Sequence, residues 1–134
     1  AMSLSRNPDF MIGGISLQRM GKVLRVADMT EALVVLCTFP SSEKARQIGT
    51  HLVERQYAAC INILPAVESI YQWDGKLCQE QEVMAVIKTT RQAFPVMSRE
   101  LSALHPCAEP EIIAMPVVDG SAGYLAWLTD QARG

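Results

Sequence analysis

Several side chains that commonly bind metal ions lie close together near the carboxyl end of the chain. His105 and Cys107 are two residues apart, and Glu109 and Glu111 follow them. An extended H-x-C segment can direct the imidazole and the thiol to the same side. Imidazole, thiolate and carboxylate together suit Cu(II) or Zn(II) better than Mg²⁺ or Ca²⁺. The sequence therefore predicts a metal site that includes His105, Cys107 and Glu111.

Cys37, at the end of the first expected strand, is a further candidate metal ligand. These ligands are scattered along the chain, so we expect any metal affinity to be modest. The alternative is structural. His105 would then end a helix, where a cationic imidazole interacts with the helix dipole, and the glutamates would simply be solvated.

A second candidate site combines Lys88 with Tyr71 and Trp73. Tyr71 and Trp73 are two residues apart, so on a strand they share one face. A cation beside two amphipathic aromatic rings could line a crevice between subunits that accepts a small anion. The alternative is that both rings are interface anchors, because Tyr and Trp are enriched at protein interfaces. Glu80 and Glu82 fit a solvated strand edge better than a catalytic pair.

The expected secondary structure alternates strands and helices in a recognisable order. Pro40-Ser41-Ser42 ends the first strand and offers a helix N-cap, Asp74-Gly75 provides a hairpin turn, and Thr89-x-x-Gln92 is similar to a capping box. The expected strands are 32–39, 58–64, 67–73, 77–89 and 111–118, with helices over 42–56, from about 94 to 104, and after Ser121. Strands 58–64 and 67–73 flank Pro65, which favours a bend or a bulge. The order β-α-β-β-α-β predicts an α+β, ferredoxin-like fold with a short C-terminal helix.

The strands are too apolar for a sheet that has one face in water. Such a sheet alternates apolar and polar residues, whereas ALVVLCTF, VMAVI and IIAMPVV carry apolar residues at consecutive positions. The two main helices can cover only one face of four strands. We therefore expect a second copy of the chain to cover the other face, in a closed homo-oligomer.

Composition restricts the remaining functions. The chain has 134 residues, 49% of them hydrophobic and 19% charged, with a net charge of −2, which argues against a nucleic-acid binder. No apolar run reaches the roughly 18 residues of a membrane span. The four cysteines form no CxxC pair and no zinc-finger spacing, which is typical of reduced thiols in a cytoplasmic protein.

Six short segments in a fixed order give the chain its family resemblance. They are VLCTFP at 35–40, AACINILP at 58–65, SIYQWDGK at 69–76, EVMAVIKTT at 82–90, HPCAEPEII at 105–113 and YLAWL at 124–128. With these segments the chain resembles the CutA family of divalent-cation tolerance proteins. The resemblance implies a ferredoxin-like fold, a trimer and copper binding, with Cys37 in an element that carries cysteine in some members. One departure is Cys107, where the family usually has tyrosine.

The resemblance covers roughly residues 31–131 and none of the first thirty. We expect 31–134 to form a single domain. Residues 1–30 lack periodicity, and we interpret them as a poorly ordered leader: vector residues, an over-extended start or a natural arm.

The sequence carries no signature of the enzymes, metal chaperones or RNA-binding modules that we considered. The chain has no M-x-C-x-x-C, no RNP1 aromatics, no Gly-rich phosphate loop and no Ser-His-Asp set. We therefore expect a non-enzymatic trimer linked to divalent-metal tolerance, with Cu(II) or another divalent metal as a possible ligand and no organic cofactor. The alternative is a small-molecule sensing trimer, by fold analogy with PII-like regulators, with its ligand in the crevice between subunits. A purely structural assembly module is a third class.

Overall fold

A computed structural model describes residues 11–12, 15–16 and 30–134 of the chain. The chain divides into two units, Ala1–Thr30 and Glu31–Gly134. In the first unit, β1 (Met11–Ile12) pairs antiparallel with β2 (Ile15–Ser16), a short ladder that the sequence did not predict. Apart from Thr30, the rest of the predicted leader lies outside the described residues.

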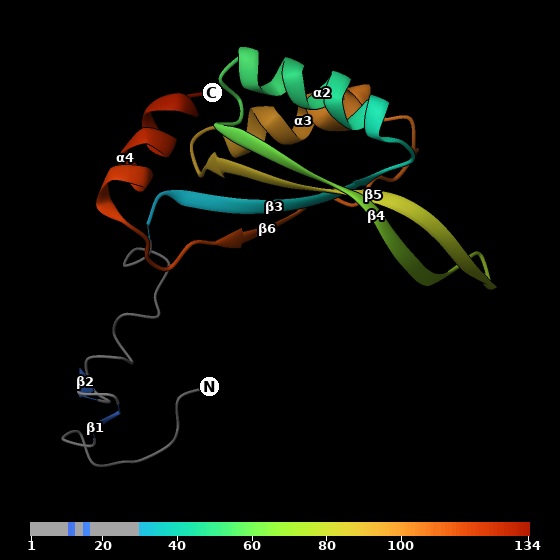
Figure 1. Ribbon diagram of the computed structural model, residues 1–134, viewed down its shortest axis with the longest axis horizontal. Coiled ribbons are helices and arrows are strands. Elements are labelled where there is room, and N and C mark those ends of the chain that lie inside the picture. Colours follow the sequence, from blue (N-terminus) through green and yellow to red (C-terminus); the bar gives the residue numbers. More distant parts are fainter. Residues whose placement is uncertain (1–10, 13–14, 17–29) are drawn as a thin grey trace. The chain divides into compact units, whose positions relative to one another are not determined.

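The second unit is the predicted α+β fold (Figure 1). Its elements are β3 (Ala32–Phe39), α2 (Ser42–Glu54), β4 (Cys60–Trp73), β5 (Lys76–Thr90), α3 (Phe94–Leu104), β6 (Ile113–Pro116) and α4 (Ala122–Gln131). The four strands form one antiparallel sheet in the order β4-β5-β3-β6. The element order β-α-β-β-α-β with a C-terminal helix is therefore confirmed.

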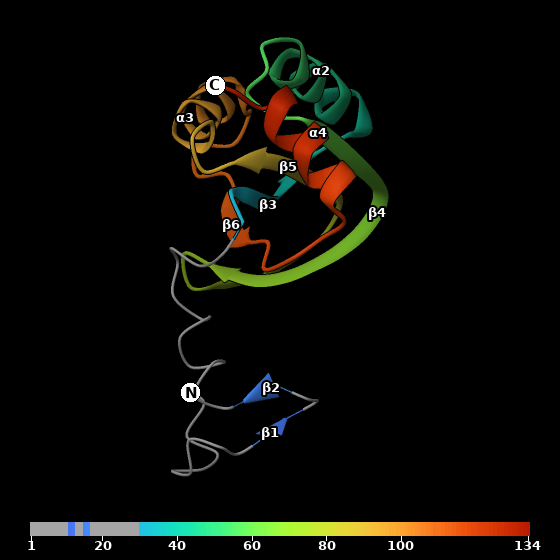
Figure 2. The same cartoon turned by 90° about the vertical axis from the view of Figure 1, so that its left-hand side faces the viewer.

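Helices α2 and α3 lie side by side on one face of the sheet (Figures 1 and 2). The core between these two layers contains Val35, Cys37 and Phe39 of β3, Val83, Ala85 and Ile87 of β5, Ala45, Ile48 and Leu52 of α2, and Met97 and Leu101 of α3. These residues follow the period of 2 on the strands and the helical stripe on α2 and α3. Burial of this face is what holds the helices on the sheet.

Among the described residues, α4 reaches the opposite face of the sheet only at one end, where its Leu128 clusters with Ala32 of β3, and no helix covers the rest of that face. Leu36, for example, pairs with Val86 of β5 and Ile113 of β6, and directly opposed residues share a face. Leu64 is 44% exposed and Ile113 is 53% exposed. An apolar face thus lies open in the single chain; we call its residues Val34, Leu36, Leu64, Met84, Val86, Ile113 and Met115 the open face.

Several predicted boundaries change in the structure. The two strands expected around Pro65 are one long strand, β4, with a register shift between Leu64 and Val67. The shift is consistent with the lack of an N–H on proline. Of the predicted strand 111–118, only Ile113–Pro116 forms a strand.

The helix starts were predicted with mixed success. Ser41 caps α2, because its side chain accepts a hydrogen bond from the Lys44 N–H. The prediction of a capping box at Thr89 is wrong. Helix α3 begins at Phe94 after Ala93, with no side-chain cap, and Thr90 Oγ1 instead accepts from the Ala93 N–H at 3.1 Å.

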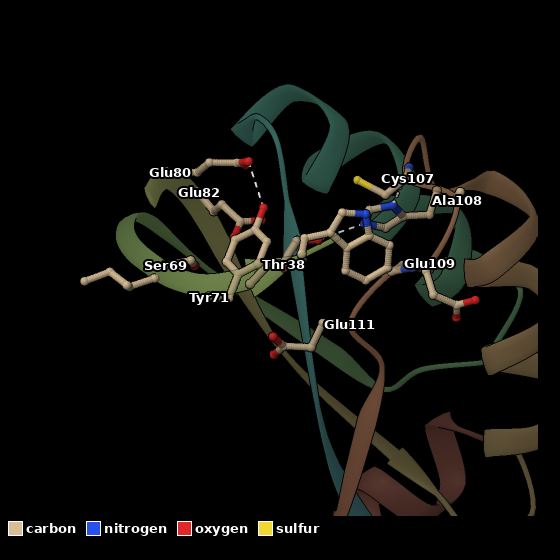
Figure 3. A pocket seen from close by; sticks show the side chains of 13 residues that line it. Thr38, Ser69, Tyr71, Glu80, Glu82, Cys107, Ala108, Glu109 and Glu111 are labelled. Atoms are coloured by element: carbon tan, nitrogen blue, oxygen red, sulfur yellow. Dashed lines mark hydrogen bonds between the residues drawn. The ribbon is translucent and has the colours of Figure 1, made fainter. Parts of the chain in front are cut away.

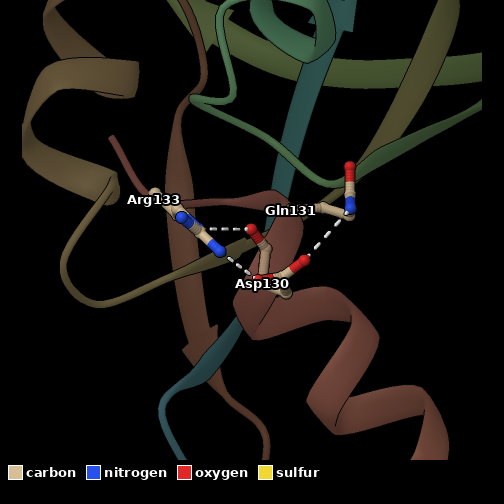
Figure 4. A network of polar contacts seen from close by, with 3 residues as sticks. All are labelled: Asp130, Gln131 and Arg133. Atoms are coloured by element: carbon tan, nitrogen blue, oxygen red, sulfur yellow. Dashed lines mark hydrogen bonds and ion pairs between the residues drawn. The ribbon is translucent and has the colours of Figure 1, made fainter.

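The end of the chain is tied to the domain by hydrogen bonds. Thr90 Oγ1 donates to the Ala132 carbonyl at 2.7 Å, and the Gly134 N–H donates to the Gln56 carbonyl at 3.0 Å. Arg133 closes onto Asp130 through both the backbone carbonyl and the carboxylate (Figure 4). Within the described residues, no helix is both long enough and apolar enough to cross a membrane.

Candidate functional site

A hollow of about 720 Å³ opens where the sheet meets the loop after α3. One wall is the hairpin at the far end of β4 and β5, residues 67–82, which we call the arm. The other wall is the segment 105–111, which we call the loop. The residues that line the hollow are Thr38 of β3, Ser69, Ile70, Tyr71, Trp73, Glu80 and Glu82 of the arm, and His105, Cys107, Ala108, Glu109, Pro110 and Glu111 of the loop (Figure 3).

The turn of the arm sets which side chains face this hollow. Asp74 and Gly75 both have positive φ, 53° and 75°, as a two-residue type I′ turn requires. This turn pairs Trp73 with Lys76, so that Ser69 lies opposite Glu80. Alternation then places Glu80 on the same face as Tyr71 and Trp73.

His105 anchors the loop to the end of β3. Its Nε2 lies 2.8 Å from the Thr38 carbonyl oxygen, and its Nδ1 accepts from the Cys107 N–H at 3.0 Å. A carbonyl can only accept, so Nε2 carries the proton and the ring is neutral. The ring also stacks on Phe39, with centroids 4.9 Å apart, and His105 is only 7% exposed.

These contacts favour the structural alternative for His105 in the single chain. Both ring nitrogens already have partners, so a metal ion could bind the imidazole only after one of these hydrogen bonds broke. In the single chain, His105 links the loop to β3 through these hydrogen bonds. It lies at the C-cap of α3, as the structural alternative expected, but as a neutral ring bonded to Thr38.

Cys37 lies in the core under the helices rather than in the hollow. Burial, with smaller contributions from Glu111, Cys107 and Glu82, raises the pKa of the Cys37 thiol to about 12. Its Sγ donates weakly to the Thr38 carbonyl at 3.7 Å. A thiol must lose its proton to act as a ligand, so Cys37 is a poor metal ligand near neutral pH.

Cys107 and Glu111 remain as candidate ligands. Both are exposed and both line the hollow. Among the described residues, however, no group of three or more His, Cys, Asp or Glu side chains is arranged to hold a metal ion. The structure therefore does not bring the four predicted ligands together as one coordination site within a single chain.

The three residues of the second predicted site do not lie together in the single chain. Tyr71 and Trp73 line the hollow, but Lys88 pairs with Cys60 at the other end of β5, whereas Tyr71 pairs with Cys78. Ten residues of strand span roughly 33 Å. Lys88 instead donates a hydrogen bond to Asn62 Oδ1. Lys88 could join the aromatic pair only across a contact between chains.

The sequence interpretation underestimated the acidic residues of the arm. Tyr71 donates its hydroxyl to Glu80 Oε1 at 2.7 Å. This hydrogen bond is the main reason why the pKa of Tyr71 is raised to about 12. The signal was present in the sequence, because the Asp74-Gly75 turn fixes the register and so places Glu80 and Glu82 beside the aromatic residues.

The chain matches known proteins over most of its length. The family model "CutA1 divalent ion tolerance protein" matches residues 33–131. A divalent-cation tolerance protein CutA of Thermus thermophilus is 47% identical over 97 residues, which cover 72% of this chain and 94% of that protein. A solved structure of the Cut A1 protein from Thermus thermophilus has a TM-score of 0.74 at 46% identity, covering 75% of this chain and 98% of that chain.

Two further relatives differ in the compartment that their names give. Protein CutA, chloroplastic, of Arabidopsis thaliana is 35% identical over 102 residues, covering 76% of this chain and 56% of that protein. The periplasmic divalent cation tolerance protein CutA from Archaeoglobus fulgidus has a TM-score of 0.72 at 31% identity, covering 77% of this chain and 99% of that chain. From the family match and these identities, the chain belongs to the CutA1 divalent ion tolerance protein family.

Proposed function

We propose that this protein acts as a non-enzymatic homotrimer in the tolerance of divalent cations, and that it holds Cu(II) or another divalent ion weakly. The observation that carries the proposal is the family match over residues 33–131. The family is generally not enzymatic, in agreement with the sequence prediction.

The open face supports the oligomer. Met115 is 43% exposed and Ile113 is 53% exposed, on the same sheet face as half-buried Val86. Contiguous apolar surface of this kind marks an interaction site, and a further copy of the chain is the simplest cover. The number three rests on the family resemblance.

The metal contact is best assigned to Cys107 and Glu111. They are the two predicted ligands that are exposed in the hollow, and thiolate and carboxylate are suitable donors for Zn(II) and Cu(II). Two ligands give weak binding, so we propose that water or a second subunit completes the coordination. Since the family usually has tyrosine at position 107, this contact would be particular to this chain.

The remaining predictions concern location and partners. The names of the relatives place related chains in the chloroplast and the periplasm, so a cytoplasmic location is kept as a proposal. The net charge of −2 favours neither nucleic acid nor an anionic membrane as a partner.

Native mass spectrometry of the full chain with and without metal tests both parts of the proposal. We expect a trimer that gains Cu(II), and also Zn(II), which cannot oxidise the thiol. Cys107→Tyr should weaken metal uptake by about tenfold, equivalent to about 1.4 kcal/mol. Cys78→Ser is the matched control, because Cys78 is a half-buried thiol that does not line the hollow.

Two results would contradict the proposal. A stable monomer at micromolar concentration would remove the oligomer, and equal metal uptake by wild type and Cys107→Tyr would remove the Cys107 contact. His105→Ala should reduce uptake only indirectly, through loss of the Thr38 and Cys107 hydrogen bonds that fix the loop.

A small-molecule sensing trimer remains a second candidate function. One observation favours it: the hollow has the size of a typical ligand pocket and combines aromatic rings with a few polar groups.

A further inference from the structure

The carboxylates that line the hollow give it charge of one sign. Four carboxylates line it: Glu80 and Glu82 from the arm, and Glu109 and Glu111 from the loop. No Lys or Arg is among its lining residues in the part of the chain that the structure describes. Low-dielectric walls with one sign of charge raise the local concentration of the opposite ion. The hollow therefore favours a cation and disfavours the small anion expected beside Lys88.

The carboxylates are distributed over two walls rather than gathered at one point. Figure 3 shows Glu80 and Glu82 beside Tyr71 on the arm, with Glu109 on the loop across from them. The described acidic, thiol and imidazole groups include no set of three arranged around a single metal ion. Carboxylates on separate walls are matched by a cation whose charges are themselves separated.

The surfaces between the carboxylates are apolar or aromatic. Trp73 is 60% exposed in the single chain, and Pro110 also lines the hollow. Aromatic faces attract ammonium groups through the cation–π interaction, worth about 0.5–1 kcal/mol at exposed sites. Methylene groups between two ammonium groups would contact the same surfaces. The aromatic pair is thus a feature, separate from the acidic residues, that fits an organic cation.

Glu80 is also held in place for such a ligand. The Tyr71 hydroxyl donates to Oε1 at 2.7 Å, and a carboxylate can accept several hydrogen bonds. Tyr71 therefore orients Glu80, and the other carboxylate oxygen is left to accept from a cation.

We propose that this hollow binds a linear aliphatic diamine or polyamine, with one ammonium group at the arm carboxylates, the other at the loop carboxylates, and the alkyl chain against Trp73. This ligand class lies beyond divalent-cation tolerance, and its binding does not depend on that role. The volume of about 720 Å³ falls in the range of small-molecule sites, about 300–1,000 Å³.

Isothermal titration calorimetry of the full-length protein at low ionic strength tests the proposal, with spermidine, 1,4-diaminobutane and butylamine as probes. We expect saturable binding of spermidine. Butylamine carries a single charge and can reach only one wall, so it should bind at least fivefold more weakly than 1,4-diaminobutane. Equal affinity of these two amines would overturn the two-wall geometry.

Variants then locate the site. Glu82→Gln and Glu109→Gln should each weaken spermidine binding by about two- to fivefold, which corresponds to one exposed ion pair. Trp73→Leu should weaken it to a similar degree. Glu43→Gln is the matched control, because Glu43 is an exposed carboxylate in the first turn of α2, outside the hollow, and it should bind like wild type.

Other outcomes would overturn the proposal. Absence of saturable spermidine binding at millimolar concentration would mean that the hollow takes no free amine, including the case in which a basic side chain of a second copy fills it. If Glu43→Gln weakened spermidine binding equally, the binding would depend on the net charge of the protein and not on the hollow. Metal uptake through Cys107 is measured without any amine, so the two proposals can fail separately.

Discussion

The two faces of the sheet have similar apolar sequences but opposite surroundings. On the face under α2 and α3, Val35, Ala85 and Ile87 are completely buried. On the open face, their immediate strand neighbours Val86 and Leu36 are half-buried, and Leu64 is 44% exposed. Apolar content therefore does not say which face holds the domain together and which is available to a partner. Covering helices decide that.

This difference assigns separate roles to residues that are adjacent in sequence. Ala85 packs into the core, whereas Val86 points to the other side of the same strand. Substitutions on the covered face should lower the stability of each chain. Substitutions on the open face should act mainly on assembly.

Phe39→Ala should have the largest effect on the covered face. Phe39 is fully buried and stacks on His105, and truncating a buried Phe to Ala costs about 3–5 kcal/mol. Urea unfolding should show this loss. Leu64→Ala on the open face is the comparison, with an expected loss below about 1 kcal/mol within a single chain. Equal losses at the lowest workable protein concentration would contradict the contrast between the faces.

Val86→Asp should separate assembly from folding. A charge buried at an interface without a partner is costly, so we expect association to weaken by about 2–3 kcal/mol while the chain still folds. Sedimentation velocity should show a shift toward monomer, with an unchanged circular dichroism spectrum. Thr50→Asp, at an exposed position of α2, should leave the oligomer intact. An intact oligomer in Val86→Asp would mean that the open face is not the interface.

Much of this architecture follows from local sequence signals. The strand Ala32–Phe39 was predicted to the residue, because a buried central strand is a continuous apolar run that ends at Pro40. The Asp74-Gly75 turn and the Ser41 cap are equally local. Each of these features depends on residues within one turn or one strand, so the chain segment itself contains the information.

The candidate site depended on contacts between distant segments, and there the sequence was less informative. Cys37 and His105 were both chosen for their chemistry. The structure places the thiol under the helices and gives both nitrogens of the imidazole protein partners. Lys88 and Tyr71 are both on long strands, but they lie at opposite ends of the sheet. Residue type cannot reveal burial, hydrogen-bond partners or separation along a strand.

The buried Cys37 thiol should make the covered face sensitive to alkaline pH. Its pKa is raised from 9.0 to about 12, so the folded state keeps a proton that the unfolded state loses. This contribution to stability is complete below pH 9 and is lost as the pH rises from 9 toward 12. Between pH 8 and pH 10, wild type should lose about 1 kcal/mol more stability than Cys37→Ala.

Urea unfolding of both proteins at the two pH values measures this difference. Tyr71, whose pKa is also raised, is present in both proteins, so its titration cancels in the comparison. Parallel losses in the two proteins would show that Cys37 ionises as readily in the folded chain as in the unfolded chain.

The smallest expected difference in stability is between alanine substitutions at two helical glycines. Gly49 lies where α2 packs on the sheet, and a Cβ there would meet Ile61 Cδ1 at 2.8 Å and Cγ2 at 3.0 Å. Gly123 lies in α4, and a Cβ there would meet nothing within 4 Å. Alanine favours a helix over glycine by about 0.8–1 kcal/mol. Gly123→Ala should therefore stabilise the protein by about 0.5–1 kcal/mol.

At Gly49 the same gain is opposed by overpacking, which typically costs about 1–3 kcal/mol, so Gly49→Ala should destabilise by about 0.5–1 kcal/mol. Thermal unfolding should move the two melting temperatures in opposite directions. A shift of the same sign in both would mean that Ile61 moves aside at little cost, and that the covered face packs less tightly at this helix than its complete burial indicates.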